Sequence, residues 1–183
     1  ALRFHRAGYR LALVARRVQE IESWAEGQQL PAESYAIYSA DVSDTHSIVE
    51  AGQACITRQG VPDVVIANAG ISVGVDTAVR SDLEVIQRTF ATNNIGMAAT
   101  FHPFIDAMVA RGSGTLVGIG SVAGIRGLPG HGAYCASKAA VISYCESLRG
   151  ELRPAGVRVV TVCPGYVDTP LTQRNRYSMP FLM

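Results

Sequence analysis

Five short apolar runs divide this chain, and they constrain its fold more than any other feature. They cover residues 10–15, 34–39, 63–67, 114–120 and 157–163, and a stretch with helical periodicity follows each of the first four. The run Asp63-Val64-Val65-Ile66-Ala67 is apolar at consecutive positions, so both faces of that strand need cover. Such strands, alternating with helices, predict an α/β fold: a doubly wound parallel sheet in a three-layer αβα arrangement.

The helical stretches end near residues 27, 58, 111 and 153. Ser43-Asp44 predicts the N-cap of the second, and a break is expected near Thr92-Asn93-Asn94 in the third. The sequence contains no internal repeat, linker or low-complexity segment. We therefore expect residues 1–183 to form a single domain.

Composition limits the classes of partner. The 183 residues are 48% hydrophobic, with a net charge of +1, so charge gives no reason to predict nucleic acid or a membrane as a partner. No apolar run approaches the roughly 20 residues of a membrane span. The four cysteines are scattered without a C-x-x-C pair, which predicts free thiols in a cytoplasmic protein and no metal site.

The stretch Tyr134-Cys135-Ala136-Ser137-Lys138 opens the last helical region. Positions i and i+4 share a helix face, so Tyr134 and Lys138 point into the same space. Lys138 is the only lysine of the chain, all fifteen other Lys or Arg positions being arginine. An ammonium beside a phenol stabilises the phenolate, which suits a general acid or base for an alcohol or ketone. The alternative is a chance spacing on an ordinary amphipathic helix.

Ligands of doubly wound sheets bind beyond the carboxyl ends of the strands. The residues at those ends are Arg16, Asp41, Asn68, Ser121 and the Pro164-Gly165 turn. Most of them are polar, as a nucleotide site requires, although turns are commonly polar for other reasons.

Residues 118–123 match the G-x-G-x-x-G/A dinucleotide pattern by letters only. The motif has meaning when it opens a helix, whereas here it leads into a stretch rich in glycine and proline. A true phosphate loop would precede the first helix, and the chain begins inside that helix. We therefore expect the fold to be incomplete at both ends, without the first strand and glycine-rich loop and without a final helix and strand.

Together these motifs resemble the short-chain dehydrogenase/reductase family of NAD(P)-dependent oxidoreductases, from Ala1 to about Thr172. The matching segments are Asn68-Ala69-Gly70, Asn93-Asn94-Ile95-Gly96, Ser121, Tyr134 with Lys138, and Pro164-Gly165 with Thr169. The resemblance implies a Rossmann-like fold and hydride transfer between the cofactor and a secondary alcohol or ketone. Tyr134 would exchange the proton, Lys138 would assist it, Ser121 would polarise the carbonyl, and Asn93 would order a water.

The resemblance also implies a set of cofactor-binding residues. They are Arg16, Arg17, Asp41, Val42, Asn68, Ala69, Gly70, Tyr134, Lys138, Pro164, Gly165, Val167 and Thr169. The strand that ends at Ala15 is followed by arginines and no acid, which favours NADP over NAD. The alternative is that Arg17 faces solvent and Arg16 alone decides.

The resulting prediction is an NADP-dependent carbonyl reductase that acts on a small-molecule alcohol or ketone. By resemblance we expect a homodimer or homotetramer. One alternative is a non-catalytic NAD(P)-binding sensor or scaffold. Another is a dehydratase or epimerase, which usually has altered residues around the tyrosine.

Overall fold

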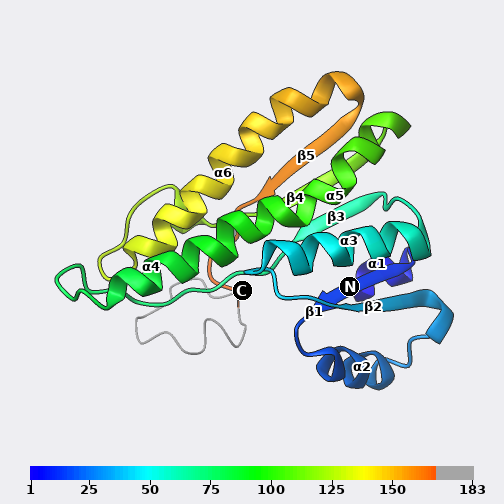
Figure 1. Cartoon of the computed structure of the whole chain (residues 1–183), viewed down its shortest axis with the longest axis horizontal. Coiled ribbons are helices and arrows are strands. Elements are labelled where there is room, and N and C mark those ends of the chain that lie inside the picture. Colours follow the sequence, from blue (N-terminus) through cyan, green and yellow to red (C-terminus); the bar gives the residue numbers. More distant parts are fainter. Residues whose placement is uncertain (168–183) are drawn as a thin grey trace.

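The computed structural model describes residues 1–167, and all its strands pair in parallel (Figure 1). β1 (Leu11–Ala15) pairs with β2 (Tyr35–Ser39), from Leu11 opposite Tyr35 to Ala15 opposite Ser39. β3 (Val64–Ala67), β4 (Gly114–Ile119) and β5 (Val157–Val162) form a second sheet in that order. No strand of the described residues pairs with both β1 and β3, so the strands make two sheets rather than one.

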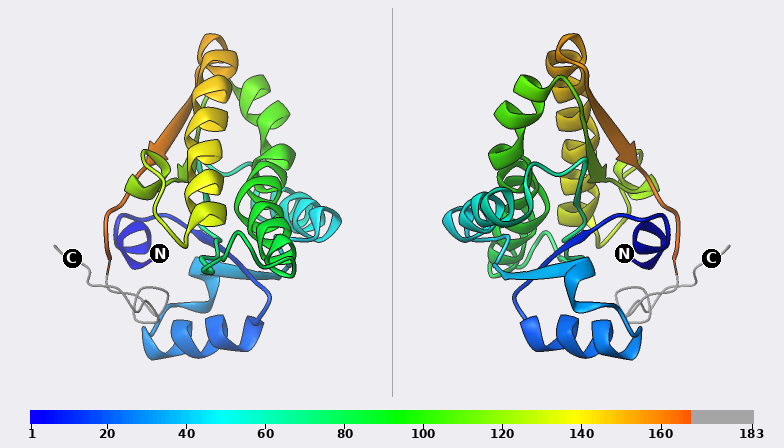
Figure 2. Two further views of the ribbon diagram at one scale, coloured as in Figure 1. Left: turned by 90° about the vertical axis from the view of Figure 1, so that its left-hand side faces the viewer. Right: turned by 90° about the vertical axis from the view of Figure 1, so that its right-hand side faces the viewer.

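Six helices connect and cover these strands in the described part of the chain. They are α1 (Leu2–Arg6), α2 (Val18–Gly27), α3 (Thr45–Gln59), α4 (Asp82–Phe90), α5 (Gly96–Arg111) and α6 (Gly132–Leu152). Short 3-10 helices lie at Ala32–Ser34, Val122–Gly124 and Arg153–Ala155. α5 and α6 pack on β3, β4 and β5, and α3 packs beside α5. α2 covers β1 and β2 from the side opposite α3 (Figure 2). The predicted αβα arrangement of parallel strands is confirmed.

Local sequence explains where α3 begins, and a π-helical turn forms the junction of α4 with α5. The Asp44 carboxylate caps α3, since its Oδ1 accepts the backbone N–H groups of His46 (3.0 Å) and Ser47 (3.2 Å). We expected two helices with a break near Thr92, and the structure has two helices there without a break in the helical path. Residues Ala91–Ile95 make a π-helical turn that joins α4 to α5 without interruption. Such turns widen the helix locally and change the direction of the side chains, and they are frequent at functional sites.

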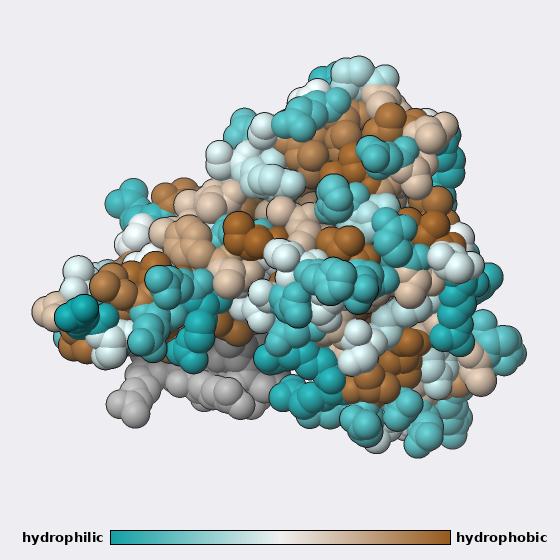
Figure 3. Space-filling view, viewed as in Figure 1, coloured by the Kyte–Doolittle hydropathy of each residue, from teal (hydrophilic) through white to brown (hydrophobic). Residues whose placement is uncertain are grey.

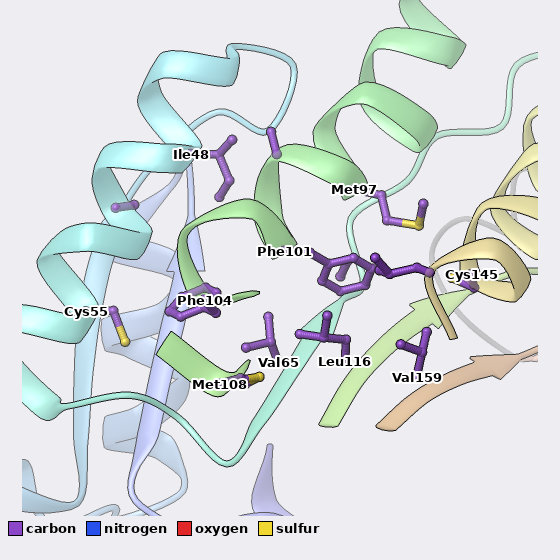
Figure 4. Packing of buried hydrophobic residues seen from close by; sticks show 14 of the residues in the cluster. Ile48, Cys55, Val65, Met97, Phe101, Phe104, Met108, Leu116, Cys145 and Val159 are labelled. Carbon is purple, nitrogen blue, oxygen red and sulfur yellow. The ribbon is translucent and has the colours of Figure 1, made fainter. Parts of the chain in front are cut away.

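The buried apolar residues form one cluster between the helices and the strands (Figure 4). Phe101 and Met108 of α5, Leu116 of β4 and Cys145 of α6 are fully buried at its centre. β4 and α6 approach closely because Gly118 has no side chain: a Cβ there would lie 2.5 Å from Cys145 Sγ. This contact fixes the height of α6 above the sheet.

The opposite face of the β3–β5 sheet is less well covered by the described residues. Ile66, Val160 and Val162 are each about 40% exposed there. On the face shown in Figure 3, apolar patches are separated by hydrophilic residues. Within residues 1–167, no helix combines the length and the hydrophobicity needed to cross a membrane.

Candidate active site

Asn93 lies in the π-helical turn and is 2% exposed. Its Oδ1 accepts the N–H of Ile71 (2.8 Å), and its Nδ2 donates to the carbonyl of the same residue (3.0 Å). This two-way bond ties the segment after β3 to the junction of α4 and α5. A buried amide with both ends satisfied is rigid, so Asn93 holds the end of β3 in a fixed position.

Lys138 is buried in the second turn of α6, and its Nζ donates to the carbonyl of Ile119 at the end of β4 (2.7 Å). Nζ lies 5.8 Å from the centre of the Tyr134 ring. Burial lowers the pKa of the Lys138 ammonium, because the charged form loses hydration. The structure therefore brings Tyr134 and Lys138 together, as the i, i+4 spacing predicts.

Asn93 and Lys138 both lie next to Gly70, in the turn after β3. A Cβ at this glycine would lie 3.3 Å from Asn93 Oδ1 and 3.5 Å from Lys138 Nζ. Any side chain at position 70 would therefore cover both polar groups. The glycine leaves room beside both groups at the turn after β3.

Ser121 follows β4 and is buried, with its Oγ accepting the N–H of Ala123 (3.2 Å). The short helix Val122–Gly124 packs directly on α6, since a Cβ at Gly124 would lie 2.9 Å from the carbonyl oxygen of Lys138. The turn that carries Ser121 thus contacts the turn of α6 that carries Lys138.

A cavity of about 560 Å³ lies at the carboxyl ends of β1, β2 and β3. The predicted cofactor residues that line it are Arg16, Arg17, Asp41, Val42, Ala69 and Gly70. Leu13, Ile21 and Trp24 add apolar side chains that the sequence analysis did not identify. Trp24 is the single tryptophan of the chain, so its fluorescence can report on ligands in this cavity.

The four charged side chains that line the cavity form two ion pairs. Arg16 Nη1 lies 3.4 Å from Asp41 Oδ2, and Arg17 Nε lies 2.7 Å from Glu20 Oε1. Hydrogen bonds from the Ser43 hydroxyl and then from its N–H hold the pKa of the Asp41 carboxyl below its usual value, with Arg16 adding to the effect. Both ion pairs are exposed, so each costs little to break when a ligand arrives.

Gly96 explains why Val42 reaches this site. A Cβ at Gly96 would clash with the carbonyl oxygen of Val42. Only glycine lets the start of α5 approach the turn after β2 so closely. Gly96 therefore brings the turn after β2 beside the start of α5, which directly follows the π-helical turn that carries Asn93.

Some predicted residues lie outside this cavity. Neither Asn68 nor Pro164 lines it. The Pro164 carbonyl accepts the N–H of Val122 (3.1 Å), which places the turn after β5 beside Ser121. Gly165 and Val167 follow in that turn, and Val167 is exposed. Thr169 lies outside the described residues. Tyr134, Lys138 and Ser121 do not line the cavity either. Gly70 does line it, and a Cβ at Gly70 would lie 3.5 Å from Lys138 Nζ, so the cavity ends beside Lys138.

The glycines at 118 and 120 serve packing. A Cβ at Gly120 would lie 2.9 Å from Cys163 Sγ, and Gly118 packs on Cys145 as described above. The segment continues as a single 3-10 turn rather than an α-helix, so it offers no helix N-terminus to a phosphate. The interpretation of this motif as a chance match is confirmed.

Comparison with known proteins identifies the family. A family model described as "short chain dehydrogenase" matches residues 1–179. The chain belongs to the short-chain dehydrogenase family.

Among curated members of this family, an "Uncharacterized oxidoreductase" of Myxococcus xanthus is 39% identical over the whole chain, which spans 72% of that protein. A "Dehydrogenase/reductase SDR family protein 7-like" of Drosophila melanogaster is 36% identical over 92% of the chain. The chain spans about half the length of that relative, 53%.

Solved short-chain dehydrogenases share the fold. A serine dehydrogenase complexed with NADP+ matches with a TM-score of 0.82 and 27% identity, covering 91% of this chain and 66% of its own. An alcohol dehydrogenase from the archaeon Thermococcus sibiricus, complexed with 5-hydroxy-NADP, gives 0.81 and 31%, covering 90% and 68%. Two nucleotide-bound dehydrogenases thus share the fold of this chain.

Proposed function

We propose that this protein is an oxidoreductase that transfers a hydride between NADP(H) and a secondary alcohol or ketone. The observation that carries the proposal is the meeting of Asn93, Lys138 and Gly70 at the edge of the nucleotide-sized cavity, with Tyr134 beside Lys138. A buried amide, a buried ammonium and a phenol form a proton-handling group at the place where a nicotinamide would enter.

Each residue then has a role that its surroundings support. Tyr134 donates a proton to the substrate oxygen or accepts one from it, and the Lys138 ammonium favours the phenolate. Ser121 donates its hydroxyl to the carbonyl oxygen and polarises it. Asn93 fixes the turn after β3 beside Lys138 and orders a water. When bound, the cofactor supplies or receives the hydride at nicotinamide C4.

The cavity of about 560 Å³ offers arginine, aspartate and apolar side chains to the adenosine part of a dinucleotide. Gly70 leaves the space that a Cβ would fill beside Lys138, so the ribose of a nicotinamide can approach the ammonium. The predicted ligands on the adenine side are Asp41 and Val42, with Ala69 in the turn after β3. Asn68, Pro164, Gly165, Val167 and Thr169 complete the proposed set on the grounds of resemblance.

NADP is the preferred cofactor in this proposal. Arg16 and Arg17 follow β1 directly, at the position where an acid would bind the 2′-hydroxyl of NAD, and a guanidinium suits a 2′-phosphate. The NADP-bound serine dehydrogenase and the 5-hydroxy-NADP complex of the archaeal enzyme support this choice. We further propose carbonyl reductase activity, a single domain, a cytoplasmic location and a homodimer or homotetramer.

Replacing Tyr134 with phenylalanine tests the proposed chemistry. Loss of general acid–base catalysis typically costs about 10²- to 10⁴-fold, so Tyr134→Phe should lower kcat at least about 100-fold with a panel of ketones and NADPH. NADPH binding, followed by Trp24 fluorescence, should stay within about twofold, because the cavity keeps its lining. Tyr144→Phe is the matched control, since Tyr144 lies farther along α6 and is exposed.

Two outcomes would contradict the proposal in different ways. Turnover by Tyr134→Phe at the wild-type rate would show that the phenol does not carry the proton. Tight NADPH binding by the wild type without turnover of any alcohol or ketone would favour a sensor or scaffold.

A further inference from the structure

Ser137 lies between Tyr134 and Lys138 in the sequence of α6, and its side chain is fully buried. Its hydroxyl donates to the carbonyl of Tyr134 (2.8 Å) and accepts from Asn93 Nδ2 (2.9 Å). One serine therefore connects the backbone of the proposed proton donor to the buried asparagine of the π-helical turn. The sequence analysis quoted Ser137 within its motif but gave it no role.

The Asn94 side chain binds the backbone of the same turn of α6. Its Nδ2 donates to the carbonyl of Ser137 (2.8 Å), while its own Oδ1 is buried without a partner in the described structure. A buried acceptor without a partner lowers stability. Asn93 and Asn94 thus bind one residue from two sides.

Few other polar contacts fix the direction of the proton-handling groups. Lys138 Nζ donates to the carbonyl of Ile119, and the Lys138 carbonyl packs against Gly124. A shift of the Ser137 turn would therefore move Tyr134 and Lys138 together relative to the end of β4. Displacements of about 1 Å at such groups can lower rates roughly 100-fold.

We propose that Ser137 is a positioning residue, which, together with Asn94, sets where Tyr134 and Lys138 lie relative to Asn93. Ser137 is fully buried, so in this proposal it acts through Tyr134 and Lys138 and not by direct contact with a ligand. This inference rests on the proposed function for its kinetic consequence, but the geometry it describes can be measured without turnover.

The kinetic test is Ser137→Ala, which removes the hydroxyl and keeps the helix. We expect kcat to fall about tenfold, the factor that corresponds to loss of the bond between Asn93 and α6, with the NADPH dissociation constant within about twofold of the wild type. Ser147→Ala is the matched control: its hydroxyl bonds to Glu151 on the exposed side of α6, so its removal should leave kcat unchanged.

The second readout uses the single lysine. Selective ¹⁵N-lysine labelling gives one side-chain signal, which titrates with the Lys138 ammonium. If Ser137→Ala lets water reach Lys138, the cost of burying the charge falls and the titration midpoint should rise. The midpoint in Ser147→Ala should equal that of the wild type.

Unchanged kcat and an unchanged Lys138 midpoint in Ser137→Ala, with a lower melting temperature only, would overturn the inference and leave Ser137 a packing residue. If that variant does not fold, Asn94→Ala tests the same turn and should move both readouts in the same directions, with no movement refuting the inference. A shifted midpoint in a protein that reduces no ketone would support the positioning role while the proposed function fails.

Discussion

Adding a methyl group at Gly118 separates a packing role from a phosphate-binding role for the glycines of β4. The new Cβ would lie 2.5 Å from Cys145 Sγ, 3.4 Å from Met97 Sδ and 3.5 Å from Val141 Cγ1. Because these neighbours are buried, the sulfur has little room to withdraw. Overpacking of this kind costs about 1–3 kcal/mol, so Gly118→Ala should lower the free energy of unfolding by that amount.

Urea unfolding followed by circular dichroism measures this change. Gly150→Ala is the matched control, because Gly150 lies within α6 and a Cβ there would meet nothing within 4 Å. That substitution should stabilise the protein by about 0.5–1 kcal/mol, since alanine favours the helix. In Gly118→Ala/Cys145→Ala the obstructing sulfur is gone, so the double variant should lose less stability than the sum of its single variants.

Two results would refute the packing argument. Strictly additive losses in the double variant would mean that the sulfur of Cys145 is not the contact that excludes a side chain. Wild-type stability of Gly118→Ala together with a large loss of NADPH affinity would instead support a phosphate-binding role for residues 118–123.

Three further changes have expected outcomes. Burial lowers the pKa of Lys138 below 10.5 in the folded state, so the unfolded chain binds more protons in the window between the lowered value and 10.5. Relative to Lys138→Met, the unfolding free energy of the wild type should therefore rise with pH across that window, and a fall measured by urea titration would contradict the burial. Arg16→Ala should raise the KM for NADPH roughly tenfold while leaving that for NADH nearly constant, because only NADPH carries a phosphate for the guanidinium; equal changes would refute the cofactor assignment. Asp44→Ala should cost about 1 kcal/mol of stability through loss of the α3 cap, whereas no shift in the urea midpoint would show that the cap is replaceable.

Much of the fold was predictable because its signals are local. Consecutive apolar residues in 63–67 indicate a strand, although the described residues leave Ile66 41% exposed on one face, and Asp44 before a helical stretch indicates a cap. The four-residue spacing of Tyr134 and Lys138 places both on one side of α6 whatever surrounds it. The order of the motifs along the chain likewise led to the correct family.

Other features depend on contacts between distant segments. The pairing of β1 with β2 and of β4 with both β3 and β5 is one such feature, because no periodicity encodes it. The π-helical turn at Ala91–Ile95 was expected as a break, because polar residues in mid-helix signal an interruption but not its form.

The sequence by itself determined the α/β class, the order of the elements and the pairing of a phenol with the only lysine, because each depends on residues a few positions apart. Only the tertiary structure decided that Ser137 and Asn94 connect α6 to the π-helical turn across more than 40 positions of sequence. It also decided that a Cβ at Gly70 would lie against Asn93 and Lys138, whereas a Cβ at Gly118 would clash with Cys145. A side chain's partners follow from close packing, which brings together residues that the linear sequence leaves unrelated.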